Sequence, residues 1–281
     1  MKQCRFALIL DKLGCASEKH ASTLDVFCSV CTNFAKNGEG SMTDRKKVFR
    51  FKQFTVVNDQ AAMRVGTDGV LLGAWCSVDG AAHVLDVGTG TGVIALMVAQ
   101  RNDAALIDAI DLDATAAEVC RINFAASPWA ERLTAIHSDV NGYNPGHGYD
   151  LIVCNPPFFG NGVLPQDSAR SIARHNQTLT IEQLISNAAR LLTATGRLAM
   201  VTPADACALV RRCVVQAGLQ IQRTTQVYPV EGRPPKRVLW EIGANVTAGE
   251  VVADTLCIEN NNPRQYSARY LALCRDFYLN M

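Results

Sequence analysis

The stretch Val84–Gly92, with the sequence VLDVGTGTG, is followed directly by the apolar run Val93–Ala99, VIALMVA. We interpret it as a buried strand, a glycine turn and a helix. Glycines let the backbone turn tightly and approach a ligand closely. The N–H groups at the start of the following helix favour an anionic group. The stretch therefore predicts a cofactor-binding loop between a strand and a helix.

The spacing of the glycines indicates which cofactor this loop binds. A glycine loop after a strand is also typical of dinucleotide sites, so the loop alone is a weak signal. Here the pattern is Asp-x-Gly-x-Gly-x-Gly, built from Asp86, Gly88, Gly90 and Gly92, and not the dinucleotide pattern Gly-x-Gly-x-x-Gly. The Asp86 carboxylate would attract the ammonium group of S-adenosylmethionine and would repel a pyrophosphate. The pattern favours S-adenosylmethionine.

Two further acidic residues follow strand-like stretches. Leu106–Ile110 ends at Asp111, the position where the second strand of a doubly wound sheet presents an acid to ribose hydroxyls. Asp113 is expected to cap the next helix. Leu133–His137 leads to Asp139, which would accept a hydrogen bond from the cofactor's adenine amino group. A capping or turn role for Asp139 stays open.

The tetrapeptide Asn155–Phe158, NPPF, follows the apolar run Leu151–Cys154. The exocyclic nitrogen of adenine, cytosine or glutamine is planar and poorly nucleophilic, so acceptors must stabilise the charge that develops on it. The Asn155 side-chain oxygen and the carbonyl of Pro156 would accept its two N–H bonds, and the two prolines fix the backbone. Phe158 offers a flat face to a flipped base. The alternative is a simple strand-ending turn.

Taken in order, these motifs resemble the class I S-adenosylmethionine-dependent amino-methyltransferases. A narrower resemblance is to the bacterial tRNA1(Val) adenine-37 N6-methyltransferase family. It rests on Phe54–Trp75, on Asn123 with Ser127–Arg132, and on the ending Tyr266–Met281. One departure is Phe158, because the family often has tyrosine there. Stacking survives this change, but any role of a phenol hydroxyl does not.

The resemblance implies an α/β fold, the Rossmann-like class I methyltransferase fold. It has a doubly wound, mostly parallel seven-stranded sheet with an antiparallel edge strand. The implied activity is methylation of the N6 amino group of adenine 37 in a valine tRNA. The implied catalytic residues are Asn155, Pro156, Pro157 and Phe158. The implied cofactor-binding residues are Met63, Gly66, Thr67, Asp68, Asp86, Gly88, Gly90, Gly92, Asp111, Asp139 and Asn155.

The rest of the chain alternates between strands and helices, which predicts a parallel sheet covered on both faces. A helix is expected over Leu179–Leu192 with Thr180 as its N-cap, and another over Ala204–Ala217 closed by Gly218. Two late strands, Gln220–Pro229 and Val238–Gly243, suggest the antiparallel edge strand. A closing helix is expected over Gln265–Leu279.

Two loops are candidates for contact with tRNA phosphates. The first, Gly160–Gln177, directly follows the catalytic tetrapeptide and carries Arg174 and His175. The second joins the two late strands and carries three cations, Arg233, Lys236 and Arg237. Cations of this kind would bind the nucleic-acid backbone. Both loops also fit an ordinary exposed connection, since Lys and Arg are mostly solvated.

Composition is consistent with a cytoplasmic enzyme. The chain has 281 residues, 48% hydrophobic residues and eleven cysteines. An odd number of cysteines scattered among core positions argues against a secreted disulfide framework. The formal net charge is only +1, with the first half of the methyltransferase region acidic and the second half basic. No membrane association is predicted, because no run is long enough to span a membrane. A stable protein partner and a metal are not predicted either.

The front of the chain stands apart from the resemblance. Residues 1–43 are expected to form an extension, and residues 44–281 a single methyltransferase domain. Cys28 and Cys31 form one C-x-x-C pair, which is half of a zinc site. A flexible extension or an unused upstream start is the favoured reading.

Two other functions remain open on the sequence. A protein-glutamine N5-methyltransferase acting on a release factor also uses Asn-Pro-Pro with an aromatic residue. The segment Thr67–Gly69 and the C-terminal ending favour the tRNA enzyme instead. A non-catalytic binding module is the third reading, but such a module has no use for the acceptor tetrapeptide.

Overall fold

The computed structural model describes residues 48–58, 65–157, 179–244, 251–261 and 265–281. These residues belong to one compact unit that spans residues 46–281. The predicted extension, Cys28 and Cys31 lie outside the described residues. The helices and strands are β1 (Val48–Arg50), β2 (Thr55–Val57), α3 (Thr67–Trp75), β3 (His83–Val87), α4 (Val93–Arg101), β4 (Leu106–Asp111), α5 (Ala114–Ala125), η3 (Ala130–Arg132), β5 (Leu133–His137), β6 (Tyr149–Cys154), α7 (Ile181–Leu191), β7 (Leu192–Pro203), η4 (Ala204–Ala206), α8 (Cys207–Gln216), β8 (Gln220–Val230), β9 (Arg237–Gly243), β10 (Val252–Glu259) and α9 (Ala268–Cys274).

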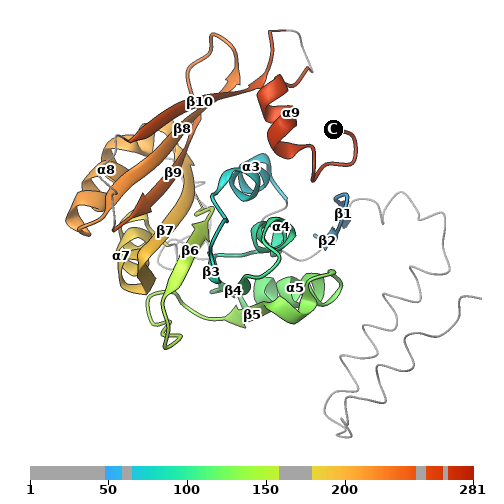
Figure 1. Ribbon diagram of the computed structural model, residues 1–281, viewed down its shortest axis with the longest axis vertical. Coiled ribbons are helices and arrows are strands. Elements are labelled where there is room, and N and C mark those ends of the chain that lie inside the picture. Colours follow the sequence, from blue (N-terminus) through green and yellow to red (C-terminus); the bar gives the residue numbers. More distant parts are fainter. Residues whose placement is uncertain (1–47, 59–64, 158–178, 245–250, 262–264) are drawn as a thin grey trace, which may run out of the picture. The chain divides into compact units, whose positions relative to one another are not determined.

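A mixed eight-stranded sheet runs through the unit in the order β10-β8-β9-β7-β6-β3-β4-β5 (Figure 1). Strand β9 is antiparallel to its neighbours β7 and β8, whereas the other paired strands of this sheet are parallel. The α/β, doubly wound, mostly parallel fold is therefore confirmed. The sheet has one strand more than the seven expected, and its antiparallel strand lies inside the sheet.

The additional strand is β10, which pairs with β8 and takes the edge position that β8 would otherwise have. Its sequence is VADTLCIE, and alternate residues place Asp254 on the same face as the buried Leu256. A strand is recognised in sequence by regular alternation of apolar and polar residues. Because Asp254 interrupts that alternation, the sequence gives a weak signal for β10.

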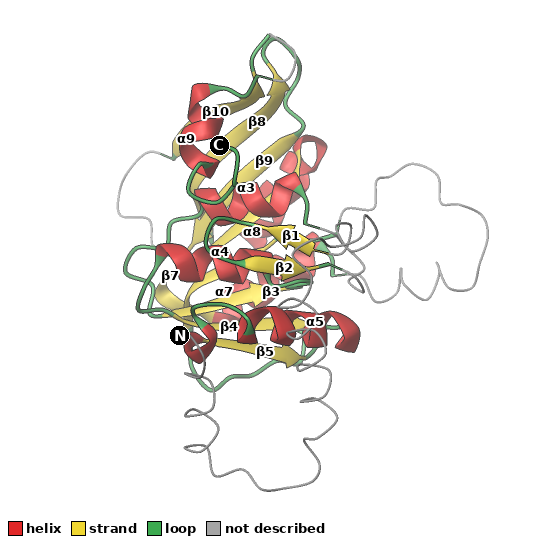
Figure 2. Cartoon of the chain, turned by 90° about the vertical axis from the view of Figure 1, so that its right-hand side faces the viewer, coloured by secondary structure: helices red, strands yellow, loops and turns green. Residues whose placement is uncertain are grey.

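Helices cover both faces of the sheet, as Figure 2 shows. Alternate residues of a strand point to opposite faces. In β6, Leu151 and Val153 belong to the core shared with α3, α4, α5 and α9. Ile152 and Cys154 belong to the second core, shared with α7 and α8. The strand is buried on both faces, which explains its continuous apolar sequence.

The predicted helix signals are confirmed where they are local. Thr180 forms a full capping box with Gln183 at the start of α7. Asp113 caps α5 by accepting a hydrogen bond from the Thr115 backbone N–H. Gly218, with φ of 69°, follows the end of α8. The closing helix α9 spans Ala268–Cys274 and is shorter than the expected range Gln265–Leu279.

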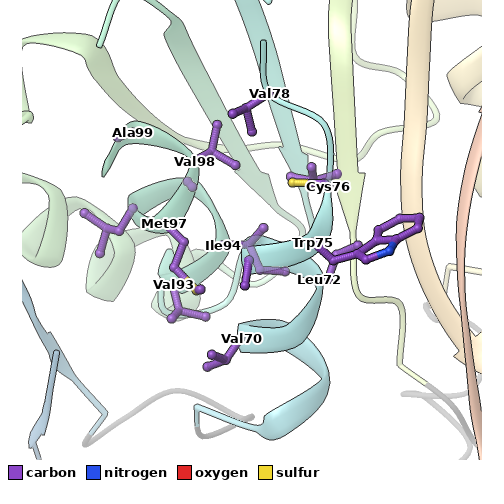
Figure 3. Packing of buried hydrophobic residues seen from close by; sticks show 14 of the residues in the cluster. Val70, Leu72, Trp75, Cys76, Val78, Val93, Ile94, Met97, Val98 and Ala99 are labelled. Atoms are coloured by element: carbon purple, nitrogen blue, oxygen red, sulfur yellow. The ribbon is translucent and has the colours of Figure 1, made fainter. Parts of the chain in front are cut away.

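Helices α3 and α4 pack closely side by side on one face of the sheet (Figure 3). Val70 and Leu72 of α3 and Ile94 and Met97 of α4 are buried in the same core. A Cβ atom placed on Gly73 would lie 2.9 Å from the Met97 sulfur. A larger residue at this position would force the Met97 side chain or the helices to shift.

Candidate active site

The glycine loop lies between β3 and α4, at the carboxyl edge of the parallel strands. Gly88, Gly90 and Gly92 have φ of 66°, 56° and 80°, a left-handed conformation that side chains disfavour. A Cβ atom on Gly92 would also approach within 2.6 Å of the Phe124 ring, whereas Gly88 and Gly90 face open space. The predicted strand, loop and helix are confirmed. The backbone of Gly88 and Gly90 is accessible to a ligand.

Asp86 lies at the base of this loop and is fully buried. Its Oδ2 accepts hydrogen bonds from Thr89 Oγ1 at 2.7 Å and from the Ala95 backbone N–H at 3.2 Å. Within the described residues, its Oδ1 is buried without a hydrogen-bond partner. Burial raises the pKa of Asp86 to about 7, against the effect of the bonds from Thr89 and Ala95. A buried carboxylate oxygen without a partner fits a cationic ligand group.

Asp111 ends β4 and holds the glycine loop in place. Its Oδ2 accepts a hydrogen bond from the Gly90 backbone N–H at 2.8 Å, and its Oδ1 accepts one from Asp113 N–H at 2.9 Å. Burial raises the pKa of this carboxyl, although both backbone bonds lower it. Each carboxylate oxygen can accept more than one bond. Asp111 can therefore bind a ligand hydroxyl while it orders the loop.

Asp139 follows β5 and is exposed. Its Oδ1 accepts hydrogen bonds from the backbone N–H and side-chain Nδ2 of Asn141, both at 2.9 Å. The Oδ1 of Asn141 in turn accepts a bond from Asn187 Nδ2 on α7, also at 2.9 Å. The turn role considered for Asp139 is thus observed. The aspartate is also anchored to α7, and its Oδ2 makes none of these bonds.

The tetrapeptide begins at the end of β6, beside β3, so Asn155 and the glycine loop lie at the same edge of the sheet. Asn155 is half-buried, Pro156 is buried and Pro157 is exposed. A Cβ atom placed on Gly69 would lie 3.8 Å from Asn155 Nδ2. The first turn of α3 therefore lies against the Asn155 side chain. Phe158 lies outside the described residues.

The residues that precede and begin α3 were also expected to bind the cofactor. Gly66 is the N-cap of α3, and Thr67 and Asp68 form its first turn. The Asp68 carboxylate pairs with Arg237 at the start of β9, with Oδ2 2.8 Å from Arg237 Nε. Met63 lies outside the described residues. The structure thus brings Asp68 to the same sheet edge as Asn155, and shows a protein partner for its charge.

The two candidate tRNA loops differ in what the structure describes. Arg174 and His175 lie outside the described residues. Arg233 and Lys236 are exposed in the connection between β8 and β9. That connection lies at the carboxyl edge of the sheet, because β8 is parallel to β7, and Pro203 at the end of β7 pairs with Arg237. Both cations are therefore at the same edge as Asn155.

Asn123 is a site residue that the sequence did not assign to any role. It is buried in α5, and its Oδ1 accepts from Val57 N–H at 2.8 Å. Its Nδ2 donates to the carbonyls of Val57, at 3.2 Å, and Thr91, at 2.8 Å. One side chain thus ties β2 to the glycine loop. The bonds of Asn123 to Val57 bridge 66 residues, so no local pattern reveals them.

Replacing Asn123 with leucine should destabilise the protein. The change leaves the N–H of Val57 and the carbonyls of Val57 and Thr91 without these bonds, and a buried group left unsatisfied costs about 1–3 kcal/mol. At about 1 kcal/mol for each of the three groups, the total is about 3 kcal/mol, which lowers the melting temperature by roughly 6–12 °C at about 2–4 °C per kcal/mol for a domain of this size. Calorimetry on the variant tests this, with leucine at the exposed Gln216 as control. A melting temperature equal to that of the control would contradict it.

The described residues contain no group of three or more His, Cys, Asp or Glu side chains placed to hold a metal ion. Nor does any helix in the described part of the chain have the length and apolar character needed to cross a membrane.

Comparison with known proteins places this geometry among methyltransferases. Residues 66–207 match the family described as Methyltransferase small domain. A tRNA1(Val) (adenine(37)-N6)-methyltransferase of Phocaeicola vulgatus is 43% identical over 233 residues, which cover 83% of this chain and 98% of that protein. The enzyme of the same name from Aliivibrio fischeri is 41% identical over 84% of this chain and 99% of its own.

Solved structures resemble the chain in fold. A predicted O-methyltransferase from Agrobacterium tumefaciens matches with a TM-score of 0.58 at 17% identity, over 75% of this chain and 96% of that protein. At such low identity the likeness concerns the fold alone. It agrees with the doubly wound sheet described above.

Proposed function

Because this chain belongs to the tRNA1(Val) (adenine(37)-N6)-methyltransferase family, we propose that it methylates the N6 amino group of adenine 37 in a valine tRNA. Its family makes it an S-adenosylmethionine-dependent methyltransferase. The observation that carries the proposal is the meeting of two features at one sheet edge. Asp86 and the glycine loop lie at the end of β3, and Asn155-Pro156 directly follows the adjacent strand β6.

The residues of the glycine loop fit the cofactor. We propose that the unpartnered Oδ1 of Asp86 receives the cofactor's ammonium group, while the open backbone of Gly88 and Gly90 approaches the ligand. Asp111 and Asp139 would accept bonds from the ribose and the adenine amino group. When bound, S-adenosylmethionine supplies an activated methyl group. The other proposed cofactor contacts are Met63, Gly66, Thr67, Asp68, Gly92 and Asn155.

The acceptor residues act on the nucleophile. Asn155 Oδ1 and the Pro156 carbonyl would accept the two N–H bonds of the target adenine, and so stabilise the positive charge that develops on its nitrogen. Pro157 helps to fix this backbone, and Phe158 would stack on the flipped base. Most of the rate acceleration then comes from alignment and electrostatics. The proton leaves to solvent after methyl transfer.

A direct assay separates this function from glutamine methylation. The purified protein is incubated with labelled S-adenosylmethionine and either unmodified tRNA or a release factor, and the methylated atom is mapped. We expect N6-methyladenine at position 37 of a valine tRNA. Label in the release factor alone would refute the tRNA assignment. The names of the curated relatives favour tRNA.

We propose that Arg233 and Lys236 bind tRNA phosphates, together with Arg174 and His175 of the loop after the tetrapeptide. Exchanging Arg233 and Lys236 for alanine should weaken tRNA binding and reduce the dependence of log K on log salt by roughly one to two. Binding titrations at several salt concentrations measure this slope. Alanine at the exposed Arg212 of α8 is the control. An unchanged slope in the double variant would remove these contacts from the proposal.

We also propose where the protein works and how its chain is divided. An enzyme that modifies tRNA would work in the cytoplasm, without membrane association and without a stable protein partner. Residues 44–281 would form the methyltransferase domain, preceded by the extension of residues 1–43.

A further inference from the structure

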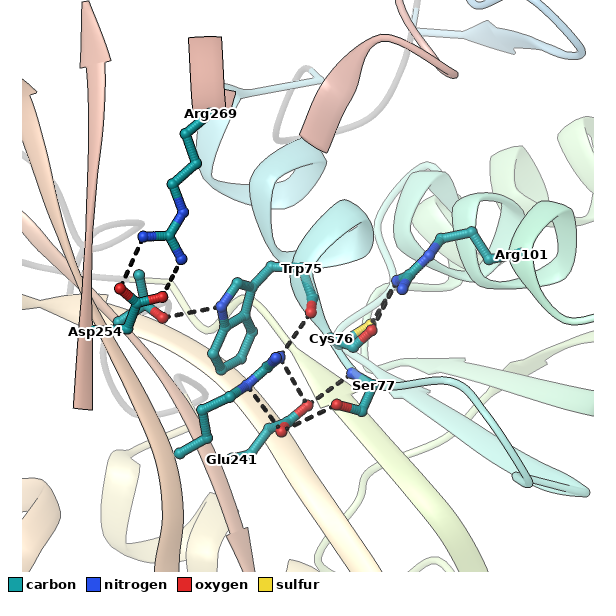
Figure 4. Close-up of polar contacts among 9 residues, drawn as sticks. Trp75, Cys76, Ser77, Arg101, Glu241, Asp254 and Arg269 are labelled. Carbon is teal, nitrogen blue, oxygen red and sulfur yellow. Dashed lines mark hydrogen bonds and ion pairs between the residues drawn. The ribbon is translucent and has the colours of Figure 1, made fainter. Parts of the chain in front are cut away.

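Both ends of helix α3 are attached to the same strand, β9. At its first turn, Asp68 Oδ2 accepts a bond from Arg237 Nε at 2.8 Å. Just beyond its last turn, the Ser77 backbone N–H and hydroxyl donate to the carboxylate of Glu241, at 2.6 Å and 3.2 Å (Figure 4). Glu241 is buried in this cluster. The helix is therefore held at two points along one strand.

The distance between the two attachment points on β9 is close to the length of helix α3. Arg237 and Glu241 are four residues apart and thus lie on one face of β9, together with Leu239 of the core that contains α3. Four residues of a strand span about 13 Å. The helical segment from Asp68 to the C-cap Cys76 spans about 12 Å. The strand therefore offers its two charged side chains at nearly the separation of the two helix ends.

The far end of α3 is a rigid anchor. The Arg223 guanidinium lies 3.8 Å from the centroid of the Trp75 ring and forms an ion pair with Glu241 at 3.1 Å. Trp75 Nε1 also donates to Thr225 Oγ1 at 3.0 Å. An ion pair, a cation–π contact and hydrogen bonds of both Trp75 and Ser77 thus meet at this end and favour one geometry. The first turn of α3, in contrast, depends on the Asp68–Arg237 pair for its attachment to β9.

The first turn of α3 is also the part of the helix that lies against Asn155. Gly69, next to Asp68, is the residue whose Cβ would approach the Asn155 amide. On the other side, Val70 packs in the core shared with α4. A displacement of this turn would therefore open space beside the Asn155 side chain. Small errors in the position of a reacting group lower rates by up to about 10²-fold.

We propose that Arg237 is a positioning residue whose ion pair with Asp68 holds the first turn of α3 against Asn155. The inference rests on the proposed function and assigns Arg237 a different role from the tRNA contact expected from the sequence. Its Nε donates to a carboxylate of its own chain, and the Arg237 side chain as a whole is only 34% exposed. A phosphate at this site would have to compete with Asp68 for the same guanidinium.

A double-mutant cycle tests the proposal. Asp68→Asn, Arg237→Met and the double variant are compared with the wild type in single-turnover methylation of tRNA at saturating substrates. Each single change should lower the rate about tenfold, with the affinity for tRNA within about threefold of the wild type. The double variant should be no slower than the slower single variant, since both changes break one interaction. Arg237→Lys should restore part of the rate, because it keeps the charge.

The opposite pattern would overturn the proposal. If Arg237 binds phosphate, Arg237→Met weakens tRNA binding and reduces its salt dependence, whereas Asp68→Asn leaves both unchanged. Additive losses in the cycle, or full rates in both single variants, would equally refute the pairing. Arg233→Ala is the matched control, with an effect expected on tRNA affinity only.

A readout without tRNA separates this proposal from the proposed function. Amide hydrogen exchange of α3 should be faster to a similar extent in Asp68→Asn and Arg237→Met, while α8 exchanges as in the wild type. Unchanged exchange of α3 would refute the proposal. Absence of tRNA methylation by the wild-type protein would instead refute the proposed function and leave the exchange result valid.

Discussion

Replacing Asn155 with alanine is expected to lower the single-turnover rate of tRNA methylation by about 10²–10³-fold. Removing one preorganised group that stabilises developing charge typically costs this much. Asn155 directly follows β6, which is buried on both faces, and the next residue is a buried proline. The residue is therefore held by a rigid element, and alanine leaves only the Pro156 carbonyl of the two proposed acceptors.

The affinity for S-adenosylhomocysteine should change much less, by threefold or so, because Asp86 and the glycine loop remain intact. Alanine at the exposed Asn260 is the control for loss of an amide elsewhere. Calorimetric titration and quenched-flow methylation measure the two quantities. Methylation at nearly the wild-type rate by the Asn155 variant would refute the catalytic role of the tetrapeptide.

The features predicted correctly from the sequence are local ones. The loop of Gly88, Gly90 and Gly92 follows from spacing, because a left-handed backbone requires glycine at fixed positions. The N-caps Asp113 and Thr180 follow from the preference of oxygen-bearing side chains for the first N–H groups of a helix. Each signal lies within a few residues, so a single sequence suffices to interpret it.

The features missed from the sequence connect distant residues. Arg237 and Asp68 are 169 positions apart, and Glu241 and Ser77 are 164 apart. Their charges are visible in the sequence, but their pairing depends on β9 lying inside the sheet beside β7. The exposed cation expected at Arg237 is consequently an ion-paired side chain in the structure.

The protonation of Asp86 should control cofactor affinity. Burial raises the pKa of this carboxyl to about 7, with Asp111 contributing further and the bonds from Thr89 and Ala95 opposing the shift. Only the ionised form attracts an ammonium group. Affinity for S-adenosylhomocysteine should therefore rise by up to tenfold per pH unit below about pH 7 and level off above it.

Asp86→Asn should remove most of this pH dependence and lower the affinity by about 10²-fold, since truncating one partner of a buried charge pair costs 2–5 kcal/mol. The residual dependence would report Asp111, whose pKa burial also raises. Calorimetric titrations of both proteins between about pH 5.5 and 7.5, where the ligand ammonium stays mostly charged, measure the difference. An affinity of the wild type that is flat across this range would contradict the contact.

Ionisation of the same carboxyl, which favours ligand binding, lowers the stability of the ligand-free protein. An unfolded Asp86 loses its proton near pH 3.8, whereas the folded one retains it to about pH 7. Between these values the folded state binds more protons, so this group's contribution to stability falls as pH rises and is lost above about pH 7.

Asp86→Asn cannot titrate and should therefore gain stability relative to the wild type as pH rises through this window. Ligand binding should cancel that gain, because an ammonium partner stabilises the ionised carboxyl in the folded state. Denaturation experiments measure the stability difference between the wild type and Asp86→Asn at several pH values. If S-adenosylhomocysteine did not change the pH dependence of this difference, Asp86 would not be the residue that receives the cation.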